Sequence, residues 1–120
     1  MKNAKVIELY EALKSLDNLT TPLPAVVNYA RAVNIKRLEV FFTEFSTAKD
    51  ELLKKFGETE DGYNYTFSEE NRPLYYKELA DILNIDVDVS IQKIKPDTVM
   101  TLDLAPKYFD VIMMITEDEV

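Results

Sequence analysis

The chain has 120 residues, and its 22 acidic and 14 basic side chains leave a net charge of −8. It contains no Cys and no His, which excludes disulfides, thiolate zinc sites, Ser-His or Cys-His nucleophiles and most transition-metal centres. The negative charge disfavours nucleic acid and anionic membranes as direct partners, because both repel an acidic surface.

Length and composition predict a single domain over residues 1–120. Apolar residues make up 47% of the chain and charged residues 30%, which is typical of a folded domain and not of a disordered one. Glu8, Glu11 and Lys14 interrupt the apolar run that a signal peptide would need, and no stretch approaches the roughly 20 apolar residues of a membrane span. We therefore expect a cytoplasmic protein.

Two helices are predicted in the first half of the chain. Apolar residues at helical spacing indicate an amphipathic helix over residues 4–16. The sequence Thr20-Thr21-Pro22 is a typical helix start, residues 25–56 contain neither Gly nor Pro, and Gly57 is expected as a left-handed C-cap. The resulting helix of about 34 residues would be about 50 Å long, which exceeds the diameter of about 35 Å of a compact domain of this size.

The apolar stripe of this long helix changes phase between Val33 and Leu38, where the spacing is five residues. The slip leaves two alternatives. Either the helix kinks near this point, or its two halves face different partners. The two seams are formed by Leu23, Val26, Ala30 and Val33, and by Leu38, Phe41, Phe45, Ala48 and Leu52.

The second half of the chain predicts short strands and short helices. Helices are expected from Asn71 to Asn84 and after Asp103, with a turn at Asp61-Gly62. Strand patterns cover residues 63–67, 85–92 and 98–104, and the sequence of the second, IDVDVSIQ, alternates strictly between apolar and polar residues. The predicted fold class is therefore α+β: a helical hairpin with one long helix, a small antiparallel β-sheet and flanking helices.

Asp86 and Asp88 are a candidate metal site. They lie two apart on the predicted strand 85–92, so their side chains point to the same face with backbones roughly 6.6 Å apart. Paired carboxylates can hold Mg²⁺ or Ca²⁺, but two ligands do not complete a site, and no Asp/Glu-x-Lys signature follows them. The alternation alone accounts for both acids as the solvated face of a strand, so we expect no metal and no cofactor.

The stretch LEVFFTEF, residues 38–45, is the candidate protein-binding site. One interpretation is a central helix that is buried on two or three sides. The other is a surface for self-association or for a protein partner, because an exposed aromatic cluster on a helix too long for its domain would otherwise promote aggregation. The candidate residues are Leu38, Val40, Phe41, Phe42 and Phe45.

Several stretches, in order, carry a resemblance to a family. They are IELYEALKSL, PLPAVVNYARAVNIKRLE, AKDELLKKFGE, an Asp-Gly turn, YKELADILNIDVDVSIQKI and a closing helix started by proline. Together they cover most of the chain and resemble a family of small uncharacterised proteins encoded by tailed phages and prophages of Gram-positive bacteria. The resemblance implies a phage or prophage origin and a host-cytoplasm setting. The family has no assigned activity, so no functional residue is carried over, and VFFTEF departs from its polar mid-helix.

Three functions remain as hypotheses. The first is a non-enzymatic phage accessory protein that acts by protein–protein binding, either as a homo-oligomer or by docking on a virion or host protein. The second is an acidic inhibitor that imitates nucleic acid in the basic groove of a host defence nuclease, which a pI of about 4.5 permits. The third is a carboxylate-dependent metalloenzyme built on Asp86 and Asp88.

Overall fold

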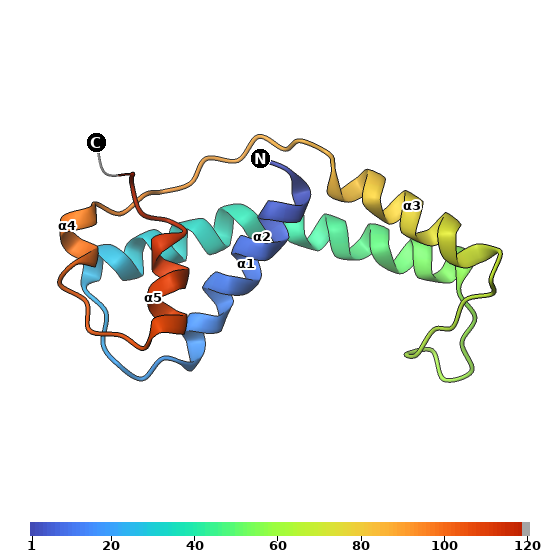
Figure 1. The fold of residues 1–120 in the computed structure, drawn as a ribbon, viewed down its shortest axis with the longest axis horizontal. Coiled ribbons are helices and arrows are strands. Elements are labelled where there is room, and N and C mark those ends of the chain that lie inside the picture. Colours follow the sequence, from blue (N-terminus) through green and yellow to red (C-terminus); the bar gives the residue numbers. More distant parts are fainter. Residues whose placement is uncertain (119–120) are drawn as a thin grey trace.

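One long helix, α2 (Ala25–Phe56), runs through the computed structural model from end to end, and the other elements pack along it (Figure 1). The structure describes residues 1–118, and its principal dimensions are 52 × 29 × 21 Å. Its other helices, in chain order, are α1 (Asn3–Ser15), a 3-10 helix (Leu16–Asn18), α3 (Asn71–Leu83), α4 (Pro96–Val99) and α5 (Pro106–Met113). None of the helices in residues 1–118 is long and apolar enough to cross a membrane.

The predicted antiparallel sheet is wrong, and with it the α+β fold class. Residues 1–118 contain no β-strand, and their only strand-like pairings are the isolated bridges Lys2↔Asp86, Glu58↔Thr66 and Ile94↔Thr116. The segment 85–95 is extended, but it lies along α2 and not beside other strands (Figure 1). Alternation predicts that an extended segment has one buried face and one solvent-exposed face. It does not show whether the edges of the segment pair with other strands, so the pattern alone did not specify a sheet. The protein is helical.

The other two predicted strands are also wrong. Residues 63–67 belong to the loop between α2 and α3, where only Thr66 forms a bridge. Residues 98–104 begin inside α4, because Pro96 occupies its first helical position and starts a short helix there. Tyr63 is 88% exposed, whereas Tyr65 and Phe67 are half-buried, so the alternation reports packing of two side chains and not a strand.

The long helix is confirmed, and it ends at Phe56 with Gly57 as its C-cap, as predicted; its predicted start and the predicted conformation of Gly57 are wrong. It begins at Ala25 and not at Pro22, because a residue that precedes proline avoids helical geometry and Leu23 precedes Pro24. Gly57 has φ −97° and ψ 164°, so it is extended and not left-handed. Its lack of a side chain is needed for space: a Cβ at Gly57 would lie 2.7 Å from the Leu53 carbonyl oxygen.

The phase slip between Val33 and Leu38 is absent from the buried face of the helix, whose buried residues Val27, Ala30, Asn34 and Leu38 follow one another at steps of three and four. The helix is unbroken from Ala25 to Phe56. Its first half packs under α1, and its second half packs along α3 (Figure 1). The two halves therefore face different elements, but the first predicted seam is wrong in part: Val26 is 53% exposed, and the buried Asn34 was not included because it is polar.

The closing helices follow the prediction in part. α3 was expected from Asn71, which is its first helical residue; the Asn71 side chain does not cap the helix but donates to the Phe56 carbonyl oxygen at 3.1 Å. In α5, Asp103 provides no cap, and Pro106 is the first helical residue. Met113, the last residue of α5, is 48% exposed.

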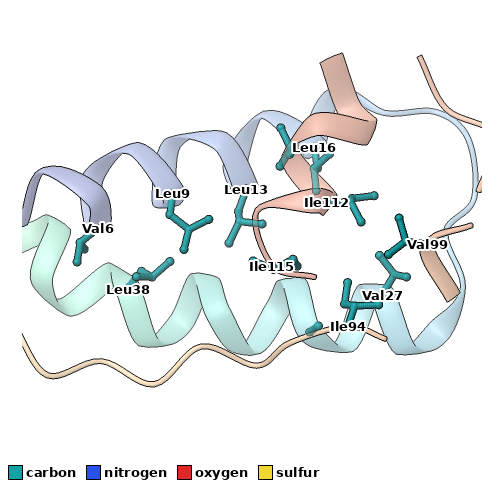
Figure 2. Packing of buried hydrophobic residues seen from close by; sticks show 12 residues of the cluster. Val6, Leu9, Leu13, Leu16, Val27, Leu38, Ile94, Val99, Ile112 and Ile115 are labelled. Carbon is teal, nitrogen blue, oxygen red and sulfur yellow. The ribbon is translucent and has the colours of Figure 1, made fainter. Parts of the chain in front are cut away.

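The hydrophobic core lies at one end of the molecule, between α1, the first half of α2, α5 and the residues around α4 (Figure 2). Its members are Val6, Leu9, Leu13, Leu16, Val27, Ala30, Leu38, Ile94, Val99, Val111, Ile112 and Ile115. Residues 39–83, which we call the arm, comprise the second half of α2, the following loop and α3. Tyr75 is the only buried residue in the arm, so this part of the molecule is two helices without a core of their own.

Candidate protein-binding groove

Two of the five candidate residues pack against other residues of the same chain. Leu38 is completely buried in the core. Phe42 is half-buried and stacks on Tyr10 of α1, with ring centroids 4.4 Å apart and planes at 25°. Both side chains therefore serve the packing of α1 on α2, and the interpretation of Phe42 as a free surface residue is not supported by its position.

Val40 is separate from the others. Its side chain is 58% exposed, and helical geometry places it about 140° around α2 from Phe45. An isolated exposed valine is normal on a protein surface and indicates no site by itself.

Phe41 and Phe45 are brought together by the structure, one turn apart on α2, in a groove of about 300 Å³. The groove lies where α2, the end of α3 and the start of the extended segment meet. Its lining residues are Asn3, Phe41, Glu44, Phe45, Ala48, Ile82, Ile85 and Val87. Glu44 is the only charged residue among them, so the groove suits apolar side chains of a binding partner.

The sequence interpretation missed most of this groove, since only Phe41 and Phe45 among its lining residues were predicted as site residues. Ala48 lies on the same seam as Phe45 and could have been included from its spacing. Ile85 is 51% exposed, whereas Val87 and Val89, the next apolar residues of the segment, are half-buried. Ile82 and Val87 lie about 40 residues from Phe45 in the chain, and only the fold brings them to it.

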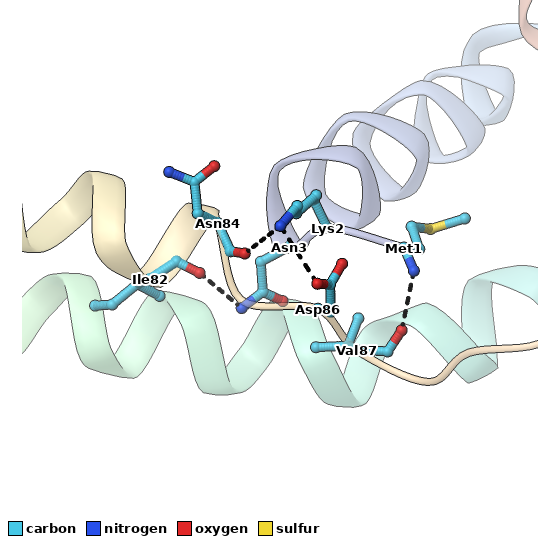
Figure 3. A network of polar contacts seen from close by, with 7 residues as sticks. All are labelled: Met1, Lys2, Asn3, Ile82, Asn84, Asp86 and Val87. Carbon is cyan, nitrogen blue, oxygen red and sulfur yellow. Dashed lines mark hydrogen bonds and ion pairs between the residues drawn. The ribbon is translucent and has the colours of Figure 1, made fainter.

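The N-terminus holds the rim of the groove in place (Figure 3). The Asn3 side chain donates from Nδ2 to the Ile82 carbonyl oxygen at 3.1 Å, and its backbone N–H donates to the Ile85 carbonyl oxygen at 2.9 Å. Lys2 Nζ donates to the Asn84 carbonyl oxygen at 3.0 Å. The Asn84 carbonyl is one that the end of α3 leaves without a partner within the helix, whereas the Ile82 carbonyl also accepts from the Ile85 N–H at 3.2 Å. The end of α3 and the start of the extended segment are thereby fixed to α1.

Asp86 and Asp88 are not drawn into a cation site. Both are exposed, and Asp86 Oδ2 lies 3.3 Å from Lys2 Nζ (Figure 3). Among residues 1–118, no group of three or more His, Cys, Asp or Glu side chains could hold a metal ion. The two carboxylates therefore form the solvated face of an extended segment, which lacks the sheet that was expected around it.

A second cavity, of about 470 Å³, lies in the loop between α2 and α3 and is lined by Glu58, Thr59, Glu60, Asp61, Asn64 and Thr66. Asp61 Oδ1 accepts hydrogen bonds from the backbone N–H groups of Asn64 and Tyr63, both at 2.8 Å. These bonds, with that from the Asn64 side chain, hold the pKa of the Asp61 carboxyl well below its usual range. The carboxylate thus stabilises the turn that it belongs to.

The groove offers apolar contact and little chemistry, since its polar groups are the Glu44 carboxylate and the Asn3 amide, and the latter already binds the Ile82 carbonyl. Its aromatic and β-branched lining is typical of surfaces that bind proteins. Comparisons of the chain with protein-family models, curated proteins and solved structures find no match.

Proposed function

We propose that the chain is a non-enzymatic protein-binding module whose groove between Phe41, Phe45 and Ile85 receives apolar side chains of a partner protein. In the phage setting that the sequence resemblance implies, the partner is a virion or host protein. The observation that carries the proposal is the position of this apolar groove on an arm that has no core of its own.

The surface area of the chain supports a bound partner. A compact protein of this mass exposes about 6,700 Å², whereas this chain exposes 8167 Å². The excess, about 1,500 Å², is larger than the roughly 800 Å² that one protein contributes to a standard interface. The radius of gyration, 17.7 Å, also exceeds the value of about 14 Å for a compact chain of this length.

The charge of the chain favours a basic partner over a second copy. Two copies would each bring a net charge of −8 to the interface, and Glu44 would lie at its rim on both sides. A partner with Lys or Arg around its apolar contacts would gain from the same charges. Self-association is the competing form of the proposal, and the mass of the protein in solution separates the two.

The test compares two arginine substitutions on α2. Ala48→Arg fills the groove with a long side chain while Glu44, one turn before it, supports the helix by an i,i+4 pair of opposite charge. Ala32→Arg is the matched control: the residue is exposed, carries the same change of charge and lies about 24 Å along the helix. Circular dichroism confirms that both variants are folded.

We expect the tagged wild-type chain and Ala32→Arg to retain the same partner from the cells that produce the protein, and Ala48→Arg to lose it. A partner retained equally by all three chains would show that binding does not use the groove. If none of the chains retains a protein and each runs as a monomer, the protein-binding proposal is overturned.

A further inference from the structure

Side chains of α2 cover one edge of the extended segment 88–93 in part. Asn34 Nδ2 donates to the Gln92 carbonyl oxygen at 2.9 Å, and the Gln92 N–H donates to Asn34 Oδ1 at 2.7 Å. Arg37 Nη1 donates to the Ser90 carbonyl oxygen at 3.1 Å. Side chains of α2 thus replace a neighbouring strand at the Ser90 carbonyl and at both backbone groups of Gln92.

The opposite edge begins with an antiparallel pairing and then stops. The Val87 N–H donates to the Met1 carbonyl oxygen at 2.8 Å, and the Met1 amine donates to the Val87 carbonyl oxygen at 3.2 Å (Figure 3). Odd-numbered backbone groups point the same way in an extended segment, so those of Val89 and Ile91 continue this edge. Within residues 1–118 the N–H and C=O groups of Val89 and Ile91 have no hydrogen-bond partner.

This open edge is held rigidly. The side chains of Val87, Val89 and Ile91 pack against the core, so the segment cannot turn its edge inward. In Figure 1 the segment, coloured yellow to orange, runs along the border of the molecule from α3 to α4. Val89 and Ile91 are half-buried and not buried, and unpaired backbone groups are rarely sealed from water, so we infer that this edge faces solvent. A rigid, unpaired edge of this kind is a template for another strand.

We propose that residues 88–93 bind an extended basic peptide, which adds antiparallel to this edge as a continuation of Met1–Asn3. Lys2 lies opposite Asp86 in the existing antiparallel pairing, with Nζ and Oδ2 3.3 Å apart. This contact pairs a basic residue of the added strand with an acidic residue of the edge. Asp88 is the next acid on the same exposed face, so a peptide residue opposite it is Lys or Arg. The site binds the peptide through backbone hydrogen bonds. This proposal does not depend on the proposed function of the Phe41–Phe45 groove.

The probes are three synthetic peptides that alternate Lys and Val, with blocked ends. The first has an ordinary backbone. The second is N-methylated at the Val residues, whose N–H groups would face Val89 and Ile91. The third is N-methylated at the Lys residues, whose N–H groups would point away from the protein. The second and third peptides carry the same charge and the same number of methyl groups. They differ only in which edge of the peptide keeps the N–H groups that can form backbone hydrogen bonds.

Amide hydrogen exchange at Val89 and Ile91 is the readout. In the free protein we expect both amides to exchange quickly and those of Val87 and Gln92 to be protected. The ordinary and Lys-methylated peptides should slow exchange at Val89 and Ile91 by at least about tenfold, whereas the Val-methylated peptide should not. Asp88→Lys should weaken binding of the ordinary peptide at least about fivefold, and the matched control Asp103→Lys should leave it unchanged.

Three results would overturn the proposal. The first is the absence of any protection by the ordinary peptide at millimolar concentration. The second is equal binding of all three peptides, which would show attraction by charge alone. The third is protection of Val89 and Ile91 in the peptide-free protein that rises with protein concentration together with a doubled mass, which would identify a second copy as the occupant. None of these results depends on whether Ala48→Arg abolishes binding at the groove.

Discussion

Asn34 holds the backbone of Gln92, 58 positions further along the chain, by both atoms of its side-chain amide. Its Nδ2 donates at 2.9 Å and its Oδ1 accepts at 2.7 Å. Asn34 is completely buried, so its amide supplies the two hydrogen bonds that a neighbouring strand would otherwise provide. The segment around Gln92 can therefore stay extended without a sheet.

Asn34→Asp should destabilise the protein by about 2–4 kcal/mol, because a carboxylate oxygen would face the Gln92 carbonyl in a buried site. Asn28→Asp on the same helix is the control. Asn28 is exposed and donates only to the Leu23 carbonyl oxygen at 3.2 Å, so the loss should stay below about 1 kcal/mol. Urea unfolding measures both, and equal losses would mean that the Asn34–Gln92 pair does not hold the segment.

Gly57 and Gly62 should respond differently to asparagine. Gly62 has φ +80° and open space around it, so Gly62→Asn should cost less than Gly62→Ala, since asparagine tolerates left-handed geometry. At Gly57 a Cβ would lie 2.7 Å from the Leu53 carbonyl oxygen and 2.9 Å from the Tyr65 ring, so both substitutions should cost about 1–3 kcal/mol. Thermal unfolding of the four variants decides this. Rescue by asparagine at Gly57 would contradict the steric explanation.

Asp61 should order its loop in a pH-dependent way. Hydrogen bonds from the backbone N–H groups of Asn64 and Tyr63 keep its pKa in the folded chain below the ordinary value. A carboxyl with a lowered folded pKa contributes stability that is fully present above the unfolded value of about 3.9 and is lost as the pH falls through the folded pKa. We expect the amide resonances of Tyr63 and Asn64 to stay constant down to about pH 4 and to move below it. In Asp61→Asn this transition should disappear, and a midpoint at or above pH 4 in the wild type would refute the assignment.

The arm should open locally more easily than the rest of the molecule. Tyr75 is its only buried residue, and burial raises the pKa of the Tyr75 phenol. Local stability follows buried contacts, so amides of α3 should exchange faster than those of α1, which buries Val6, Leu9 and Leu13 in the core. Hydrogen exchange followed by mass spectrometry measures the contrast. Equal protection of the two helices would mean that the arm needs no partner to cover it.

The sequence predicted the helices well where apolar periodicity was long, as in α1, α2 and α3. It failed for the sheet because alternation over residues 85–92 indicates one buried and one solvent-exposed face. The alternation does not show which groups form hydrogen bonds with the backbone at the edges of the segment. Here Asn34, Met1 and Arg37 supply those bonds from distant positions. No local pattern marks an asparagine in a helix as the partner of an extended segment.

Only a small part of the candidate site was predicted, for a similar reason. Phe41 and Phe45 followed from the spacing of one helix, whereas Ile82, Ile85 and Val87 reach the groove only through the packing of α3 on α2. The sequence also could not separate Phe42 from its neighbours, because the ring that covers it, Tyr10, lies on another helix.

Site-specific photo-crosslinking tests the binding groove most directly. A photoreactive amino acid replaces Glu44, which lines the groove, or Glu39, which is exposed about 140° around α2, in the cells that produce the protein. We expect a single partner protein to be crosslinked from position 44 and not from position 39. Crosslinks of equal yield from both positions, or none from position 44, would contradict the assignment of this groove as the binding site.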